Sequence, residues 1–461
     1  MGAGPVPNNT NVAFWCTFYP RIGLEDTAMR KNLFIVSLDE FNHSVLRRVE
    51  NYEELEIRPV LSMEETVESD TLSFNELLGK AKRQLREFEG RIDGIMGWWD
   101  FPTTCLVPAL CQEFGLPSNS LKSVLQCEHK YWARLVQAEA APDCVPGFCP
   151  VDPFADDPRS QVTLEFPFWL KPIKGMSSHL AFRIDSEEGF NEAIGEIRER
   201  IGRLGDPFAE ALQRVDLPPE IAAAGGNLCI AEEVISGRQC TVEGYVYQGK
   251  VYIYAVIDTN KKPYYSYQYP STLPEQVIER LHNATNQVMK YIEYNNATFN
   301  IEFFWDEQSD DLRILELNPR LSQSHADIFA MVFGVPNFQI MVDLALGREP
   351  HWLNREGPAR CATKFFVTRS GDALVTEVPD AETVRAIEAK YPHTDINVRV
   401  EAGTVLSELP LQEAHGHELA EVFVGGDDPQ EVLRRFEAVL EELPFRFETS
   451  PHDKESSASA Q

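Results

Sequence analysis

Apolar runs and helical spacings alternate along the first part of the chain. Between residues 32 and 125 the runs NLFIVSL, EIRPVLS and DGIMGWW have strand character. Other segments place apolar residues three or four positions apart, which is typical of helices: FNHSVLRRVENY, FNELLGKAKRQLREF and TTCLVPALCQEFGL. Alternation on this scale predicts a doubly wound parallel sheet, and we assign it to an N-terminal α/β domain over residues 1–125.

A second region, residues 126–350, mixes longer strands with helices. It is expected to begin with a helix over residues 127–140 that carries Lys130. Further helices are expected over residues 187–201, 275–294 and 325–346. The strand-like runs are FPFWLKPI and HLAFRID, joined by a loop at 174–178, and LCIAEEVIS, TVEGYVY and KVYIYAVID, the last two joined by a turn at Gln248-Gly249.

The pattern changes again after residue 350. The short runs ATKFFVT, INVRVEAG and ELAEVFVGG precede a helix, PQEVLRRFEAVLEEL, which predicts a small α+β domain over residues 351–449. Residues 450–461 are polar, and we expect a disordered tail because they offer no apolar surface to bury.

The segment NIEFFWDEQSDDLRILELNPR, residues 300–320, predicts a β-hairpin with a polar turn at residues 307–311. If the hairpin folds symmetrically about Ser309, Glu302 lies opposite Glu316. Side chains alternate between faces, so Glu316, Asn318 and Arg320 share one face while Leu315 and Leu317 point to the other. Directly opposed carboxylates repel each other unless a positive charge lies between them. Two carboxylates, an amide oxygen and a guanidinium suit a hard divalent cation bound to phosphate.

Composition limits the classes of protein that fit. The 461 residues are too many for one core, and the net charge of −30 argues against a general binder of nucleic acids or membrane surfaces. The nine cysteines include no CxxC pair, which is typical of reduced thiols in the cytosol. The N-terminus lacks signal-peptide character, and the apolar stretch 329–347 is interrupted by polar residues and a proline. We expect a cytoplasmic protein.

Other candidates for chemistry are weaker when taken singly. Lys171 ends an apolar strand and could place its charge in a cleft, although a lone lysine more often lies along the surface. The next loop, KGMSSH, has small residues whose backbone N–H groups could face phosphate oxygens. Glu232 and Glu233 end another strand and could bind an adenine amino group, or face solvent. The sequence contains no GxxxxGK[ST], GxGxxG or HExxH motif.

In their order and spacing these segments resemble the ATP-grasp superfamily of carboxylate ligases. The segments that carry the resemblance are EHKYW, FPFWLKPIKGMSS, CIAEEVISG, NIEFF and ELNPR, and the similarity covers roughly residues 30–350. The resemblance implies an ATP-grasp fold with a two-part ATP-binding region, preceded by the parallel-sheet domain. The C-terminal segment resembles the small C-terminal domain of biotin-carboxylase-like members.

The resemblance also implies roles for individual residues, with ATP and Mg²⁺ (or Mn²⁺) as cofactors. Arg320 and Lys171 are the expected catalytic residues. Magnesium would be coordinated by Glu302, Glu316 and Asn318. The expected nucleotide contacts are Lys130, Lys171, the loop Gly175, Ser177 and Ser178, the strand end Glu232, Glu233, Val234 and Ile235, and Gln239 for the ribose.

The substrate side resembles the amino-acid (dipeptide) ligases of this superfamily, through Glu243 in TVEGYV, Asp258, and the proline Pro270. The resemblance implies that Glu243, Asp258 and Arg320 contact a small-molecule carboxylate or amine, and a homodimer is possible. Two alternatives stay open. One is carboxylate activation as in biotin carboxylase or carbamoyl phosphate synthetase, although the glutamate base of the former is Ser324 here. The other is an ATP-binding module without activity.

Overall fold

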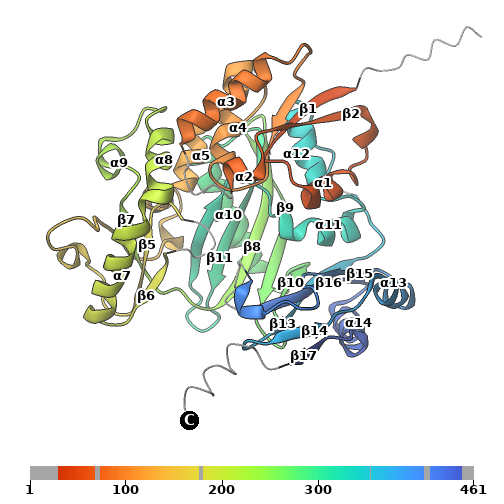
Figure 1. Ribbon diagram of the computed structural model, residues 1–461. Coiled ribbons are helices and arrows are strands. Elements are labelled where there is room, and N and C mark those ends of the chain that lie inside the picture. The colour runs from red at the N-terminus through yellow and green to blue at the C-terminus, as the bar shows by residue number, and fades with distance from the viewer. Residues whose placement is uncertain (1–29, 68–72, 176–179, 353–354, 410–415, 449–461) are drawn as a thin grey trace, which may run out of the picture.

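The computed structural model describes residues 30–67, 73–175, 180–352, 355–409 and 416–448. The predicted loop residues Ser177 and Ser178 and the C-terminal tail lie outside these ranges. The chain forms three regions, which Figure 1 shows with the N-terminal elements at the top, the four strands β4–β7 with α7 to the left of a large central sheet, and the C-terminal elements at the bottom.

The N-terminal region contains a parallel sheet of order β2-β1-β3, made of β1 (Lys31–Val36), β2 (Leu55–Val60) and β3 (Gly94–Met96). Alternate residues of β1 enter two separate cores. Phe34 and Val36 belong to the core that contains α3 (Phe74–Arg86) and α4 (Thr103–Phe114), whereas Leu33 and Ile35 belong to the core with α1 (Glu40–Leu46) and α12 (Phe338–Ala345). Helices therefore cover both faces, which confirms the prediction of a doubly wound sheet.

The expected helix over residues 127–140 is two helices, α5 (Leu121–Glu128) and α6 (Lys130–Ala140). The backbone of His129 is extended, with φ −84° and ψ 97°, and its Nδ1 accepts a hydrogen bond from the Trp132 N–H at 3.1 Å. The imidazole thus caps α6, a role that helical spacing alone does not reveal. The break places Lys130 at the first residue of α6, where its backbone N–H donates to the Ile173 carbonyl at 3.0 Å.

Beside this helix pair stands an antiparallel sheet of order β4-β7-β5-β6. It consists of β4 (Phe148–Val151), β5 (Phe168–Pro172), β6 (Phe182–Ile184) and β7 (Cys229–Glu233). Its buried face packs against α7 (Glu187–Arg200) through Phe190, Ile194 and Ile197. The chain then continues through α8 (Gly202–Leu212) and α9 (Pro219–Ala224) before it returns to β7.

The largest sheet has eight strands in the order β12-β11-β8-β9-β10-β13-β16-β15. The central part comprises β8 (Arg238–Tyr247), β9 (Lys250–Asn260), β10 (Ser266–Tyr269), β11 (Ala297–Trp305) and β12 (Leu312–Asn318), and the C-terminal part β13 (Cys361–Arg369), β15 (Thr394–Val398) and β16 (His417–Gly426). Because β10 pairs with β13, residues 361–426 extend the central sheet. The boundary expected at residue 350 therefore does not separate two sheets, because one sheet contains strands from both sides of it.

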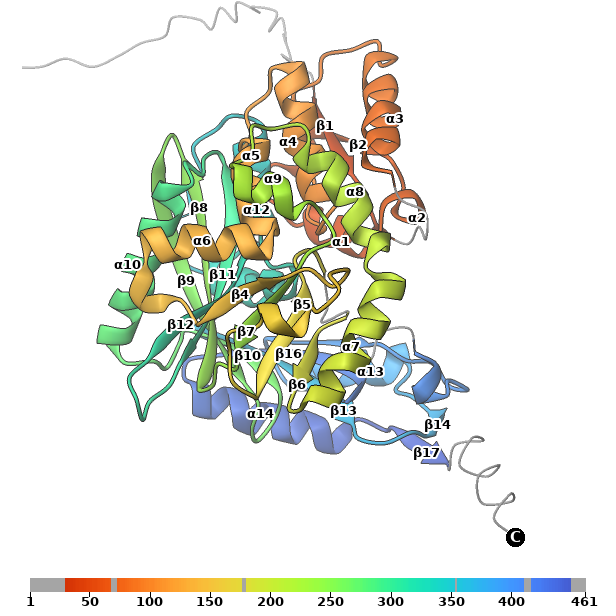
Figure 2. The same ribbon diagram turned by 90° about the vertical axis from the view of Figure 1, so that its left-hand side faces the viewer.

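Helices cover this sheet on both sides. In Figure 2, α6 and α10 (Glu275–Tyr291) lie side by side over the central strands, where both contribute to the same core. At the C-terminal strands, α11 (Ala326–Phe333) and α14 (Pro429–Glu442) belong to different cores. The remaining α-helices and strands are α2 (Met63–Thr66), α13 (Ala381–Lys390) and the strand pair β14 (Leu374–Glu377) and β17 (Arg446–Glu448).

The apolar run at residues 325–346 also forms two helices, α11 and α12, with a bend of 100° between them. Gly334 ends α11 in the left-handed conformation, with φ +80°, which a glycine adopts at little cost. No single helix of the described residues is long and apolar enough to cross a membrane, and only this bent pair reaches the required length and hydropathy together. All eight cysteines of the described ranges are buried and free.

Two glycines should respond in opposite ways to alanine. A Cβ at Gly244 in β8 would lie 2.3 Å from the Phe299 ring, whereas a Cβ at Gly195 in α7 would meet nothing within 4 Å. We expect Gly244→Ala to destabilise the protein by about 1–3 kcal/mol through overpacking. Gly195→Ala should stabilise it by roughly 0.5–1 kcal/mol through helix propensity. Urea unfolding of both variants measures this, and equal effects would contradict the packing described for β8 and β11.

Candidate active site

A cavity of about 880 Å³ lies between the four-stranded sheet and the β11–β12 edge of the large sheet. Its walls come from β5, β7, α6, β11 and β12 and from the loop after β3. Most residues singled out in the sequence meet here: Lys130, Lys171, Gly175, Glu232, Glu233, Val234, Ile235, Gln239, Glu302, Glu316, Asn318 and Arg320. Of the described candidates, only Glu243 and Asp258 are absent from the lining.

The hairpin has the predicted register, because Glu302 on β11 pairs directly with Glu316 on β12. A β-bulge follows, since Phe303 pairs with Ile314 and leaves Leu315 without a partner residue. Leu315 and Leu317, which are predicted to share the opposite face, both border the cavity, but only Leu317 belongs to the apolar core, so the prediction is wrong for Leu315. The extra residue in the strand shifts the side-chain alternation at this point, and nothing in the local sequence marks that shift.

The two opposed carboxylates have different electrostatic surroundings. Glu302 accepts hydrogen bonds from the amides of Gln239, at 3.1 Å, and Asn318, at 3.3 Å. Burial, together with the nearby charge of Glu316, raises its pKa to about 7. Glu316 forms an ion pair with Lys130 at 2.8 Å. Burial acts to raise the pKa of Glu316, but Lys130 and Lys171 outweigh it and lower that pKa.

A divalent cation fits this pair chemically. The described residues contain no group of three or more His, Cys, Asp or Glu side chains around a common centre. Mg²⁺ is, however, commonly held by only one or two carboxylates together with substrate phosphates. Glu302 is a half-buried acid whose hydrogen-bond partners are both neutral amides, so a cation beside it would relieve its repulsion from Glu316. The Asn318 amide donates to Glu302 and Asn300, which leaves its carbonyl oxygen for a ligand.

Lys171 on β5 is held by an ion pair with Glu232, at the end of the neighbouring strand β7. Its ammonium lies 2.5 Å from Glu232, and Arg134 binds the other oxygen of the same carboxylate at 2.6 Å. Burial acts to raise the pKa of Glu232, but the two cations outweigh it and set that pKa at about 2. Arg134 also donates to the carbonyls of Ile314 and Leu315 at 2.7 and 2.9 Å. Both oxygens of the Glu232 carboxylate are therefore occupied by cations, and the Glu233 backbone N–H donates to the Gly147 carbonyl at 2.9 Å.

The structure adds charged residues that the sequence did not single out. Lys174 is buried and paired with Glu128, which also accepts a hydrogen bond from the Thr104 hydroxyl at 2.5 Å. Asp100 pairs with Arg320 across the boundary between the N-terminal region and the large sheet. Both pairs line the cavity. Lys174 belongs to the KGMSSH loop and could have been found there, whereas a lone aspartate after a strand gives no signal.

Glu243 and Asp258 have internal partners instead of facing the cavity. The Glu243 carboxylate, which is fully buried, accepts from the Tyr254 hydroxyl at 3.0 Å and contacts His325 Nδ1 at 2.8 Å. Asp258 binds Arg238 at 3.1 Å and the Thr272 backbone N–H at 2.8 Å. It therefore anchors the loop after β10, and this arrangement gives no support to the expected substrate contact at either position.

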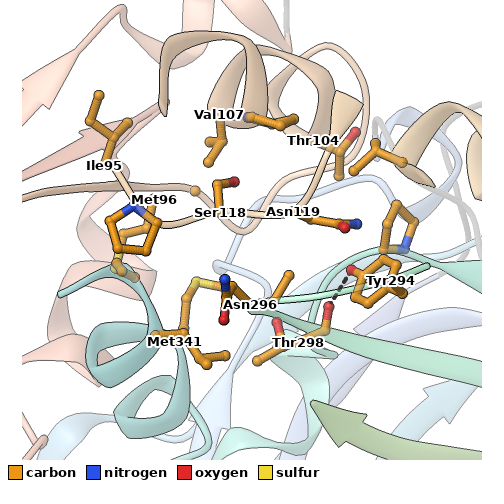
Figure 3. A pocket seen from close by; sticks show the side chains of 18 residues that line it. Ile95, Met96, Thr104, Val107, Ser118, Asn119, Tyr294, Asn296, Thr298 and Met341 are labelled. Atoms are coloured by element: carbon orange, nitrogen blue, oxygen red, sulfur yellow. Dashed lines mark hydrogen bonds between the residues drawn. The ribbon is translucent and has the colours of Figure 1, made fainter. Parts of the chain in front are cut away.

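A second, much smaller cavity of about 70 Å³ lies between α4, α12 and the start of β11. Figure 3 shows Ser118, Asn119, Thr298 and Met341 around it, with the Tyr294 hydroxyl bonded to the Thr298 carbonyl at 2.7 Å. It contains none of the predicted site residues and is of the size that a few water molecules fill.

Comparison with known proteins agrees with this geometry. The family described as ATP-grasp domain matches residues 164–326. The L-amino acid ligase of Bacillus licheniformis superposes with a TM-score of 0.67 at 16% identity, covering 92% of this chain and all of the ligase. A biotin carboxylase of Campylobacter jejuni gives a TM-score of 0.60 at 15% identity, covering 92% and 93% of the two chains. At such identities the likeness shows the fold alone.

Among curated sequences, the urea amidolyase of Saccharomyces cerevisiae is 22% identical over 351 residues, which is 74% of this chain and 17% of the yeast protein. The chain spans between 12% and 59% of the lengths of the curated relatives that it matches. The whole activity of those proteins therefore does not transfer to it.

The raised pKa of Glu302 predicts a pH-dependent effect on stability in the absence of divalent cations. The pKa in the folded protein, about 7, exceeds the ordinary value of 4.5, so the folded state holds the proton more tightly. The favourable contribution of protonated Glu302 to the free energy of unfolding is complete below pH 4.5 and is lost as the pH rises through 7. Glutamine does not ionise, so Glu302→Gln avoids the stability lost when Glu302 becomes charged. At pH 8 in EDTA this substitution should stabilise the protein by about 1–3 kcal/mol.

Near pH 4.5 the same substitution should change stability little. Thermal or urea unfolding at the two pH values measures the difference. Glu307→Gln, at an exposed position in the hairpin turn, is the control and should leave stability unchanged at both. An equal gain at both pH values for Glu302→Gln would contradict the electrostatic explanation.

Proposed function

We propose that this chain, whose residues 164–326 match the ATP-grasp domain, is an ATP-dependent ligase that joins a carboxylate to an amine. The products would be an amide, ADP and phosphate. The observation that carries the proposal is the meeting, in one cavity, of lysines from the small sheet and α6 with the opposed acids of β11 and β12. A triphosphate with a divalent cation needs both kinds of group at the same place.

The charge of the cavity supports a nucleotide ligand. Its lining contains six cationic side chains, Lys130, Arg134, Lys171, Lys174, Lys261 and Arg320, and six acids, Asp100, Glu128, Glu232, Glu233, Glu302 and Glu316. The lining is thus formally neutral although the whole chain carries a net charge of −30. The cavity is therefore a place where a polyanion meets no excess of negative charge.

The two ends of the cavity differ in chemistry. Around the end of β7, the lining combines residues 233–235 with the apolar residues Trp169, Phe304 and Leu315. We assign the adenine to this end, where its faces can stack and its edge can bond to the backbone. The ribose would follow near Gln239. The lysines and the acid pair then face the phosphates.

Mg²⁺ or Mn²⁺ would be held by Glu302, Glu316 and Asn318, and when bound it supplies charge neutralisation at the β- and γ-phosphates. Lys130 and Lys171 are each held by an acid, at 2.8 and 2.5 Å, and would turn their remaining donors to the phosphate oxygens. Arg320 would bind the transferred phosphoryl group. The loop that begins at Lys174 would exclude water, which hydrolyses an acyl phosphate.

In this reaction the substrate carboxylate attacks the γ-phosphorus and forms an acyl phosphate, with ADP leaving. The amine then attacks the activated carbonyl, and phosphate leaves. The chain's own contribution is positioning and electrostatic stabilisation. Ser324 lines the cavity where biotin carboxylases carry their glutamate base, which favours an organic carboxylate over bicarbonate as the substrate.

The test of the proposal is ADP release, followed over a panel of amino acids and simple carboxylates in pairs. We expect turnover that needs ATP, Mg²⁺, an acid and an amine together. Glu316→Gln keeps the shape of the side chain but loses its charge, and it should lose most of the turnover while the circular dichroism spectrum stays unchanged. Unaltered turnover of Glu316→Gln would reject the assigned metal site, and ADP release that needs no amine would reject the ligase.

Arg320→Ala should lower the rate at least tenfold, because a lost charge-assisted contact costs roughly 1.5–3 kcal/mol. Arg280→Ala is the control for loss of an arginine–carboxylate pair outside the cavity, since Arg280 forms an exposed pair with Asp310 of the hairpin turn at 2.8 Å. Steady-state ADP release compares the two. Near-normal turnover for Arg320→Ala would remove this residue from the mechanism.

A further inference from the structure

We propose that Asp100 is a positioning residue that fixes the Arg320 guanidinium so that one of its edges faces the transferred phosphoryl group. The inference rests on the proposed function and adds to it a contribution from the N-terminal region. Asp100 lies in the loop between β3 and α4, whereas Arg320 follows β12. The two residues are 220 positions apart in the sequence and meet at the wall of the same cavity.

The contact between them is bidentate. Arg320 Nε lies 2.5 Å from Asp100 Oδ1, and the second terminal nitrogen lies 3.1 Å from Oδ2. The first terminal nitrogen donates to the Leu321 carbonyl at 3.1 Å. Two parallel hydrogen bonds to one carboxylate fix the plane of a guanidinium as well as its place, which a single bond does not do.

Counting donors shows what this geometry leaves for a ligand. A guanidinium has five N–H donors in a rigid plane. Three of those of Arg320 have the partners just described, one on Nε and one on each terminal nitrogen. Each terminal nitrogen therefore keeps one N–H. Two such donors in one plane match two oxygens of a phosphoryl group.

The surrounding charges keep the pair ionised. Burial acts to raise the pKa of Asp100, but Arg320, followed by Lys174 and Lys130, outweighs it and lowers that pKa. A neutral residue at position 100 would lose the second strong bond and with it the fixed plane.

Attachment of the Arg320 loop to the N-terminal region does not depend on Asp100. Gln323 donates to the Trp98 carbonyl at 2.8 Å and accepts from the Asn42 amide at 2.9 Å. These bonds hold the same two parts of the chain together without touching Arg320. Asp100 is thus not needed to hold the Arg320 loop against the N-terminal region. Substitution of Gln323, which does hold it there, offers a matched control.

The test compares Asp100→Asn with Gln323→Ala in the ADP-release assay. Asp100→Asn should lower kcat at least tenfold and change the KM for ATP less than twofold, while Gln323→Ala changes kcat less than twofold. A double-variant cycle then separates positioning from structure. Lysine cannot form the bidentate contact, so in an Arg320→Lys background Asp100→Asn should lower kcat less than twofold further. The Asp100→Glu variant should recover part of the lost rate.

Loss of activity in Asp100→Asn that is as large in the Arg320→Lys background would overturn the inference, and so would a kcat equal to that of Gln323→Ala. A second measurement uses orthovanadate, a phosphoryl mimic, together with ADP and Mg²⁺ in calorimetry. Asp100→Asn should weaken vanadate binding at least tenfold and leave ADP binding unchanged. A wild-type protein with neither turnover nor vanadate binding refutes the proposed function and this inference together, whereas normal wild-type turnover with an unaffected Asp100→Asn refutes only the inference.

Discussion

The repulsion between Glu302 and Glu316 is the constraint around which the cavity is built. Strand pairing places the two acids directly opposite each other, and antiparallel neighbours of this kind destabilise a sheet when both are charged. Groups from several elements reduce this repulsion. Lys130 at the start of α6 pairs with Glu316, and the amides of Gln239 and Asn318 bind Glu302. Glu302 nevertheless keeps a pKa of about 7, because burial and the charge of Glu316 outweigh these hydrogen bonds.

The cations near these acids lie on elements that are distant in the sequence and that the fold brings together. Lys171 lies on the small sheet and Lys130 on α6, and each is oriented by an acid of its own. Arg134 links these parts, since it binds Glu232 on β7 and two carbonyls of β12 at once. A buried arginine with such partners fixes the small sheet against the hairpin. The width of the cavity is thereby set by hydrogen bonds as well as by apolar packing.

The N-terminal parallel sheet takes part in the site although it is remote in sequence. Its loop after β3 carries Asp100, and α5 carries Glu128, the partner of Lys174. A ligand in the cavity would therefore contact the N-terminal region as well as the small sheet and the large sheet. The C-terminal strands contribute differently, because they extend the large sheet through β10 and pack around Tyr267, which itself lines the cavity.

The sequence by itself determined much of this protein. A hairpin symmetric about Ser309 placed Glu302 opposite Glu316, and the alternation of strand-like runs with helical spacings predicted the parallel sheet, because both patterns follow from local backbone geometry. The resemblance to ATP-grasp proteins assembled Lys130, Lys171, Glu316 and Arg320 into one expected site, and the structure brings these residues to one cavity.

Only the tertiary structure decided the rest. The bulge at Leu315, the break at His129 and the continuous sheet across residue 350 depend on partners distant in the chain. The same holds for the pairs Asp100–Arg320 and Glu128–Lys174, and for the internal partners of Glu243 and Asp258. A charged side chain gives the same local signal whether it meets a ligand or a partner within the protein. Long-range packing alone selects between the two.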